Sequence, residues 1–429
     1  MSVDLVARAL GAKAGRSANT AALIAGIREY GNATRATERL PANDLPTLTL
    51  SANGAASTIN GNAWYAPTVN FRSELLTYLC GPIVDAGAAH PTWNYMRARG
   101  AYFGPGSRGL GSPIAYEFIH KGTQLEIPLF GQGSSGINFR LLVNGALAGT
   151  MAVPNSTGQA YYLKAVFPAS GTRRITVETN GVPANGVNVA NASVEIASTG
   201  RTPPLVTMIG DSLAEGTGAA AGEGQSLVLA RALGFDCGLA AAGGTGMINP
   251  GSRVPFTDPD RLVDLTLAGV TSTQNGSAPA SPRMGIVFGS FNDQGASPTL
   301  YGPYGATLQD AIANRTHAMI DAWLAARPGR PIVFFGPTWP SGPPNNRPPL
   351  TVYAIRDGIM EAAWSRASEN VWFIDRLMPF LREGVYSTTS DQASLYTGSD
   401  STHPTTMGHK FDGLWMAAAL RRLILSEFV

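Results

Sequence analysis

From residue 205 onwards the sequence alternates short apolar runs with longer segments that have helical spacing. The apolar runs cover residues 205–209, 284–288, 331–335 and 371–375, and the helical patterns cover 225–233, 308–327, 352–368 and 407–425. Short apolar runs are typical of buried strands, and strands that alternate with helices form a parallel sheet covered by helices on both faces. The pattern predicts an α/β domain over residues 201–429.

Residues 113–200 follow a different period. Short strand-like runs are separated there by turn signals, and Asn144-Gly145 is a strong two-residue hairpin signal. This spacing predicts an antiparallel β-sandwich ahead of the α/β domain. We expect residues 1–40 to form an N-terminal segment with one or two short helices, and residues 41–112 to form a loop-rich connecting region.

Charge and composition exclude several classes of partner. The chain has 31 basic and 29 acidic residues, a net charge of +2, with no block of like charge that could track nucleic acid or an anionic membrane. It begins without the apolar core of a secretory signal, and no stretch reaches the roughly 18 apolar residues of a membrane helix. We therefore expect a soluble protein made in the cytoplasm, either virion-associated or released by lysis, and the sequence leaves its true compartment open.

The sequence predicts no metal and no other cofactor. Cys80 and Cys237 lie far apart and outside any metal-ligand spacing, so both are expected to be buried thiols. The histidines outside the motif described next are expected to be structural or exposed; they are His90, His120, His317 and His409.

Ser212 directly follows the first predicted strand of the α/β domain, at the sheet edge where such folds bind ligands. Taken alone, a serine after Asp211 is also compatible with a helix N-cap. Asp400 and His403 precede the last predicted helix, and a cap does not explain them. Because an alcohol attacks a carbonyl only when a base takes its proton, we predict Ser212 as nucleophile, His403 as base and Asp400 as the acid that orients His403.

Acyl transfer also needs donors for the negative oxygen of the tetrahedral intermediate. The backbone N–H groups of Ser212 and Gly244 and the side-chain amide of Asn292 all follow predicted strands and can converge there. Gly243 is the alternative to Gly244, and the choice stays open. Trp339 either lines the acyl or sugar site or packs its own loop.

These residues fall in four blocks whose order and spacing resemble those of the GDSL, or SGNH, hydrolase family. The blocks are Gly210-Asp211-Ser212-Leu213, Gly243-Gly244-Thr245-Gly246, Asn292-Asp293 and Asp400-x-x-His403. The resemblance implies a flavodoxin-like three-layer α/β/α fold and cofactor-free ester hydrolysis through an acyl-serine. It implies the roles given above for Ser212, His403 and Asp400, with Ser212, Gly244 and Asn292 as oxyanion donors.

The chain departs from the common family pattern at two places. The second block lacks the Asn that often precedes its glycine, which keeps Gly243 open as the donor. The third block has one residue more between Gly289 and Asn292 than the common form, and Ser290 stands where a second glycine often occurs. Asp211 and Asp293 are expected to shape turns through hydrogen bonds rather than to act as acids.

The regions outside the α/β domain suggest a substrate. Residues 113–199 resemble the small jelly-roll domain that precedes the catalytic domain in some carbohydrate esterases, which implies O-deacetylation of a polysaccharide or glycoside as the reaction, with an acetylated carbohydrate or other small ester as substrate. Lipase-like or thioesterase activity on longer acyl chains is the enzymatic alternative.

Residues 2–14 resemble the start of some phage tail or virion proteins, so a virion structural or adhesion protein is a third hypothesis. The oligomeric state is left open.

Overall fold

The computed structural model describes most of the chain. The described residues are 18–32, 37–52, 54–59, 63–65, 75–79, 83–90, 93–98, 114–131, 139–154, 159–179, 184, 186–251, 253–268, 281–339, 348–377, 396–400 and 402–426. Within these ranges, no helix is both long and apolar enough to cross a lipid bilayer. The segment that resembles virion proteins lies outside them.

Five parallel strands form the central sheet of the α/β domain. In spatial order they are β15 (Asp236–Ala241), β14 (Leu205–Gly210), β16 (Met284–Phe288), β17 (Ile332–Phe335) and β18 (Val371–Ile374). Numbered along the chain this order is 2-1-3-4-5, which is that of flavodoxin-like folds. The predicted fold class is confirmed.

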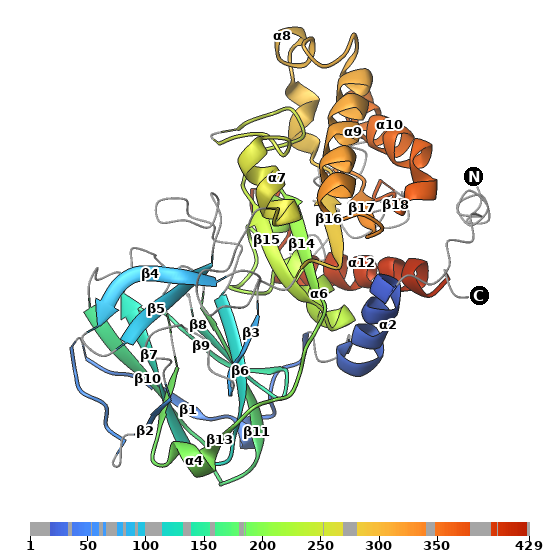
Figure 1. Ribbon diagram of the computed structural model, residues 1–429. Coiled ribbons are helices and arrows are strands. Elements are labelled where there is room, and N and C mark those ends of the chain that lie inside the picture. The colour runs from blue at the N-terminus through green and yellow to red at the C-terminus, as the bar shows by residue number, and fades with distance from the viewer. Residues whose placement is uncertain are drawn as a thin grey trace.

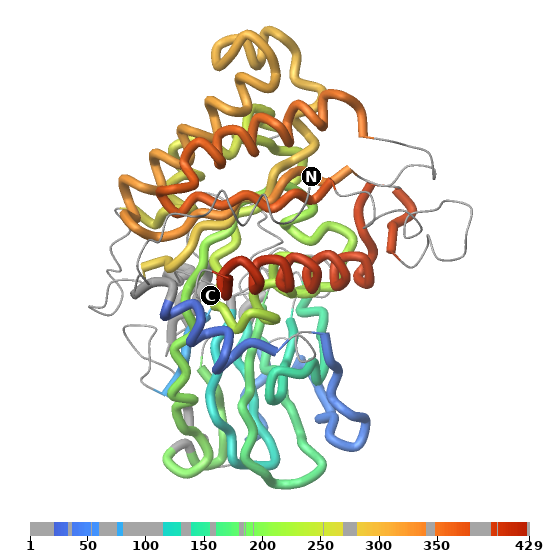
Figure 2. The backbone as a smooth tube through the Cα atoms, turned by 90° about the vertical axis from the view of Figure 1, so that its right-hand side faces the viewer, coloured from blue at the N-terminus to red at the C-terminus, as the bar shows by residue number. Residues whose placement is uncertain are grey.

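Helices cover both faces of this sheet, because each helix has an apolar side that must be buried. One face carries α6 (Gln225–Leu233), α12 (Thr406–Ser426) and α2 (Ala18–Tyr30), and the other carries α7 (Pro259–Thr266), α9 (Leu308–Ala326) and α10 (Leu350–Ser365). Figure 2 shows α12 and α2 on the opposite side of the sheet from α9 and α10. Short helices complete the domain: α5 (Ser212–Glu215), α8 (Pro298–Tyr301), η2 (Phe291–Gly295) and η3 (Ala367–Glu369).

Helix α2 is part of the core of the α/β domain although it lies far upstream in the sequence. Its residues Leu23, Ile24 and Ile27 are buried in one cluster with Leu233 and Phe235. The N-terminal segment therefore supplies a structural helix of the α/β domain.

The β-domain consists of two packed antiparallel sheets (Figure 1). The first contains β1 (Thr47–Leu50), β10 (Gln159–Val166), β7 (Gln124–Gly131), β12 (Val187–Val189) and β2 (Ala63–Tyr65). The second contains β13 (Ile196–Ala197), β6 (Ile114–His120), β11 (Arg173–Thr179), β8 (Phe139–Val143) and β9 (Ala146–Met151), with β3 (Thr77–Leu79) paired to β6. The other elements here are η1 (Ala42–Asp44), the paired strands β4 (Ile83–His90) and β5 (Trp93–Ala98), and α4 (Ala192–Glu195).

A hairpin and three short strands of the β-domain can be compared with the structure predicted from the sequence. Asn144 and Gly145 join β8 to β9 with φ angles of 53° and 89°, the left-handed conformations that a two-residue hairpin requires, so the predicted hairpin is confirmed. Strands β1, β2 and β3 come from the stretch that we expected to be loop-rich, and each pairs with a strand from residues 113–200. Short strands of this kind give little periodic signal, and long-range pairing defines them.

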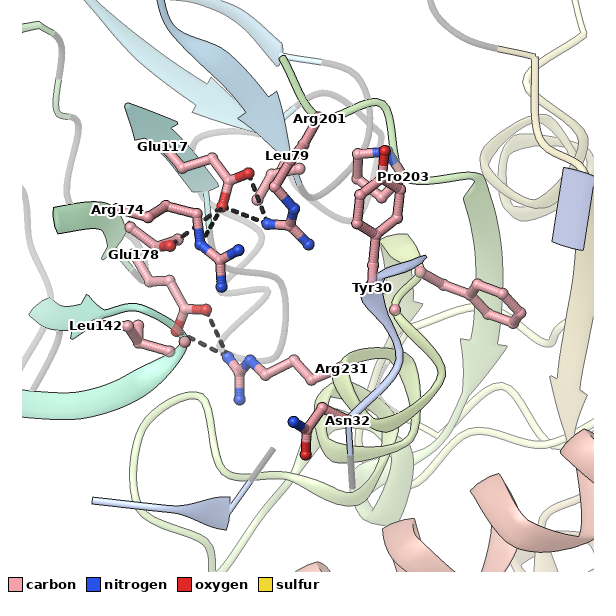
Figure 3. A pocket seen from close by; sticks show the side chains of 14 residues that line it. Tyr30, Asn32, Leu79, Glu117, Leu142, Arg174, Glu178, Arg201, Pro203 and Arg231 are labelled. Carbon is pink, nitrogen blue, oxygen red and sulfur yellow. Dashed lines mark hydrogen bonds and ion pairs between the residues drawn. The ribbon is translucent and has the colours of Figure 1, made fainter. Parts of the chain in front are cut away.

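Ion pairs join the β-domain to the α/β domain (Figure 3). The buried carboxylate of Glu117 on β6 accepts two hydrogen bonds of 2.7 Å from Arg201 Nη1, in the link between the domains. Glu178 on β11 accepts hydrogen bonds of 2.7 and 2.8 Å from Nη2 of Arg231 on α6. The Arg201 guanidinium also lies over the Tyr30 ring, 4.6 Å from its centroid. These ion pairs thus connect β6 to the link at Arg201, and β11 to α6.

Candidate active site

The turn after β14 leaves the Ser212 hydroxyl available for chemistry. Asp211 is the N-cap of α5, and its Oδ1 accepts a 2.9 Å hydrogen bond from Leu213 N. A Cβ at Gly210 would lie 2.4 Å from the Ala214 Cβ, so only glycine fits at this tight turn. Capping is therefore done by Asp211, and Ser212 is the first residue of the helix, where its N–H has no partner within the helix.

Ser212, His403 and Asp400 form a continuous hydrogen-bonded chain. His403 Nε2 lies 2.9 Å from Ser212 Oγ, and His403 Nδ1 lies 2.6 Å from Asp400 Oδ2. A carboxylate only accepts hydrogen bonds, so Nδ1 carries the proton that points to Asp400, and Nε2 accepts from the serine hydroxyl. This is the tautomer that a general base acting on Ser212 needs.

Asp400 is held in its ionised form, and its side chain is 52% exposed. The hydrogen bond from His403, together with backbone N–H bonds from His403 and Thr402 at 2.9 and 3.0 Å, lowers the pKa of Asp400 to about 2. The same backbone bonds fix the carboxylate in a tight turn. Orientation of His403 therefore depends on a charge that persists to acidic pH.

The two glycines of the second block have different neighbours. A Cβ at Gly243 would lie 3.5 Å from the Ser212 Cβ, whereas the nearest atom to a Cβ at Gly244 is Gly251 Cα at 3.9 Å. Gly244 has a φ of 74°, which favours glycine. Neither glycine donates its N–H to a backbone carbonyl of the described residues. Of the two glycines, Gly243 is thus the one whose Cα faces the serine turn, where a Cβ would also lie 3.4 Å from Glu215 Oε2.

Asn292 lies between the second block and the serine turn. Its Nδ2 donates to the Thr245 carbonyl at 3.1 Å and lies 3.5 Å from Asp211 Oδ2, the limit of a hydrogen bond. Ser290, buried, donates from Oγ to Asp211 Oδ2 at 2.6 Å and accepts from Asn292 N at 3.1 Å. The serine that replaces the common glycine thus ties the segment of Asn292 to the turn of Ser212.

Asp293 organises a segment remote from it in sequence. Its carboxylate accepts hydrogen bonds of 2.8, 3.0 and 2.8 Å from the N–H groups of Met247, Ile248 and Asn249. Burial raises the pKa of Asp293 to about 6, although these three bonds lower it. A Cβ at Gly246 would collide with this carboxylate, so Asp293 explains the glycine. The expectation that Asp211 and Asp293 shape turns holds, and Asp293 does so across two loops.

Arg261 on α7 is a fully buried residue that the sequence analysis missed. Its Nη2 donates to the carbonyls of Gly210 and Ala240, at the ends of β14 and β15, at 2.8 and 2.9 Å. Its Nη1 donates to Thr245 Oγ1 at 2.9 Å. The sequence could have indicated this burial, because Arg261 stands four residues before Leu265 and therefore lies on the same, buried face of an amphipathic helix.

An apolar cluster flanks the candidate catalytic residues. Leu213, Phe291 and Val352 are buried together, and Trp339 packs against them with its ring edge-on to Phe291 at a centroid distance of 6.1 Å. Leu213 directly follows the candidate nucleophile, and Phe291 directly precedes the candidate oxyanion amide. Trp339 Nε1 is buried and has no hydrogen-bond partner in the described parts of the chain. The position next to the site fits both roles considered for Trp339.

The other predicted residues lie apart from the site or serve its framework. His409 is buried, accepting from Gln225 N at 3.3 Å and lying 2.9 Å from the Thr217 carbonyl, while burial lowers the pKa of His120 to about 4. Cys237 is a buried free thiol, and Cys80 lies outside the described residues. Among the residues that the structure describes, no three His, Cys, Asp or Glu side chains are grouped to hold a metal ion.

The parallel sheet and the serine at its carboxyl edge define a three-layer α/β/α hydrolase. Residues 208–411, which make up most of the α/β domain, match the model of the GDSL-like lipase/acylhydrolase family. A search of curated protein sequences finds no significant match.

Several solved structures share the fold of nearly the whole chain. The salicylyl-acyltransferase SsfX3 from a tetracycline biosynthetic pathway is 16% identical, with a TM-score of 0.59 over 85% of this chain and 99% of its own. A family two carbohydrate esterase from Cellvibrio japonicus is 13% identical, with a TM-score of 0.55 over 89% and 100%. One from Clostridium thermocellum, in complex with cellohexaose, is 16% identical, with a TM-score of 0.55 over 82% and 99%. At such identities the likeness is one of fold, and it includes the β-domain.

Proposed function

We propose that the protein is a serine esterase that works through an acyl-serine intermediate. The single observation that carries this proposal is the hydrogen-bonded chain from Asp400 through His403 to Ser212. The match of residues 208–411 to an acylhydrolase family model supports the same chemistry.

In the first half of the reaction, Ser212 Oγ attacks the ester carbonyl while His403 Nε2 takes the hydroxyl proton. The ionised Asp400 stabilises the imidazolium that forms. The same Nε2 proton then passes to the leaving alcohol oxygen as the carbonyl–oxygen bond breaks. In the second half, His403 Nε2 takes a proton from water as the water oxygen attacks the acyl carbonyl. The bond between that carbonyl carbon and Ser212 Oγ then breaks, and His403 returns the proton to Ser212 Oγ.

We propose the N–H of Ser212, the side-chain amide of Asn292 and one glycine N–H as donors to the oxyanion. The position of Gly243, where a Cβ would lie 3.5 Å from the Ser212 Cβ, supports Gly243 as the donor over Gly244, which the motif resemblance favoured. The second N–H of Asn292 is only weakly engaged, 3.5 Å from Asp211, and is therefore available to an incoming oxygen. Each such donor is worth about 3 kcal/mol of activation free energy.

For the substrate, we propose O-acetyl groups on a polysaccharide or glycoside. The support is a preceding β-domain shared in fold with carbohydrate esterases, together with an apolar cluster beside Ser212. Trp339 is the proposed wall of the acyl site.

Three measurements test this function. A fluorophosphonate probe is expected to label Ser212 in the folded wild-type protein and not the Ser212→Ala variant. Turnover of p-nitrophenyl acetate is expected to exceed that of the octanoate, and acetate is expected to be released from acetylated xylan. Folded protein that the probe does not label contradicts the esterase proposal, and a tenfold preference for octanoate contradicts the acetyl specificity.

A further inference from the structure

The loop of residues 216–224, which follows the helix of Ser212, packs directly on the segment that carries His403. A Cβ at Gly218 would lie 2.4 Å from the Pro404 carbonyl oxygen and 3.3 Å from the His403 Cβ, so the two backbones touch. Ala220 N donates to Thr406 Oγ1 at 2.8 Å. Any shift of the 216–224 loop therefore moves the support of His403.

The β-domain holds the other side of the same loop through Arg140 on β8. The Arg140 side chain is 5% exposed and occupies the space where a Cβ of Gly222 would stand. Gly222 has a φ of 67°, so both its conformation and the arginine exclude a larger residue. A side chain from one domain thus determines the shape of a loop in the other.

Charge connects Arg140 to the helix that follows His403. Arg140 Nη1 lies 3.1 Å from Glu178 Oε2, and Arg140 Nη2 lies 3.9 Å from Glu223 Oε1 in the 216–224 loop. Glu223 Oε2 in turn lies 3.1 Å from Nζ of Lys410 on α12, and Arg39 also reaches Glu223 at 3.6 Å. Glu223 is therefore the carboxylate at which the two domains and α12, the helix that follows His403, meet.

Glu178 adds a second connection to the loop. It pairs with Arg231 on α6, as Figure 3 shows, and Arg231 Nη1 donates to the Gly222 carbonyl at 2.5 Å. Burial lowers the pKa of Arg140 to about 10, which leaves the guanidinium charged at neutral pH. A buried charge that loses its carboxylates is costly, so the network favours a single arrangement of the loop.

We propose that Arg140 is a positioning residue for His403, and that the β-domain is consequently part of the catalytic unit rather than only an attached binding module. This inference rests on the proposed esterase function. Arg140 touches neither the proposed substrate nor the reacting atoms. It acts through the 216–224 loop and Glu223, by fixing the surface on which the His403 segment lies.

The test compares two full-length variants by steady-state kinetics with p-nitrophenyl acetate. Arg140→Gln removes the charge that faces Glu223, and we expect kcat to fall by about tenfold with KM nearly unchanged, because alignment rather than binding is impaired. Arg140→Lys keeps the charge but not the planar fork, so a smaller loss is expected. The rate of fluorophosphonate labelling of Ser212 should fall in parallel with kcat.

Arg174→Gln is the matched control. Arg174 lies on the same face of the β-domain and pairs with Glu117 at 3.7 Å, in the part of the junction that contains Arg201 rather than Glu223. Its kcat is expected to stay within twofold of wild type. All rates are measured at a temperature at which each variant is folded by circular dichroism.

The outcomes separate the possible failures. Wild-type kcat and labelling in folded Arg140→Gln overturn the inference, as does an equal loss of kcat in Arg174→Gln. If Arg140→Gln does not fold, Glu223→Gln replaces it, because it removes the shared carboxylate and is expected to lower kcat in the same way; unchanged kcat there overturns the inference. A wild-type protein that neither labels nor turns over any ester contradicts the esterase function itself.

Discussion

The two domains use buried polar groups for different purposes. In the α/β domain, Ser212, Asn292 and His403 come from three separate segments and converge at one edge of the sheet. In the β-domain, Glu117 and Glu178 are turned towards the neighbouring domain and pair with its arginines. We infer that the first set carries chemistry and that the Glu117 pair carries placement of the domains, so substitutions of Ser212 and Asn292 should affect turnover, whereas substitution of Glu117 should affect stability.

The largest effect is expected from Ser212→Ala. Without the nucleophile, only binding and oxyanion stabilisation remain, so kcat should fall by on the order of 10⁴-fold or more. The melting temperature should change little, because the cap of α5 is formed by Asp211. Kinetics with p-nitrophenyl acetate measure kcat, and thermal unfolding measures the melting temperature. Retained turnover would show that a residue other than Ser212 is the nucleophile.

Asn292→Ala should have the next largest effect on turnover. Loss of one preorganised oxyanion donor typically costs about 10²- to 10³-fold in kcat. The variant also loses the hydrogen bond to the Thr245 carbonyl, so a modest drop in stability is expected. A loss confined to stability, with kcat preserved, would show that Asn292 is part of the framework only.

Glu117→Gln in the β-domain should give the opposite result. The change leaves Arg201 without its charged partner, and Arg201 is 19% exposed, so we expect about 2 kcal/mol of lost stability, less than for a fully buried pair. Turnover of p-nitrophenyl acetate by the folded variant should remain near wild type. Denaturant unfolding and kinetics measure the two quantities, and a large loss of kcat would show that the Glu117 pair also supports the catalytic residues.

The last effect is a pH dependence of stability from Asp293. Its pKa is raised to about 6 by burial, whereas an unfolded aspartate titrates near 3.9. Between these values the folded protein binds more protons than the unfolded chain, so this contribution is complete below about pH 4 and is lost as pH rises through 6. The stability of wild type relative to Asp293→Asn should therefore decline from pH 4 to pH 7. A constant difference across that range would contradict a raised pKa.

Several structural features could be predicted because their signals are local. The parallel strands of the α/β domain are short apolar runs, and Asn144-Gly145 specifies a hairpin by backbone conformation alone. The motif positions Ser212, Asp400 and His403 were visible from residue type and place in the chain. The structure places their side chains in one hydrogen-bonded chain. Their catalytic roles and the domain boundaries stay predictions.

Other features had no local signal. Strand β1 pairs with β10, more than a hundred residues away, and α2 packs into a core formed mostly by residues beyond 205. Arg140 has nothing in its sequence neighbourhood to connect it with Glu223 or His403. Such contacts depend on long-range packing, which periodicity does not encode.

By itself, the sequence determined the three-layer fold and the set of residue types available for acyl transfer, because strand and helix periods and turn chemistry are properties of consecutive residues. Tertiary structure alone decided that Ser290 joins the segment of Asn292 to the turn of Ser212, that Arg261 binds carbonyls at the ends of β14 and β15, and that Arg140 of the β-domain packs on Gly222. Those relations arise when segments far apart in the chain are packed so closely that each buried polar atom needs a specific partner.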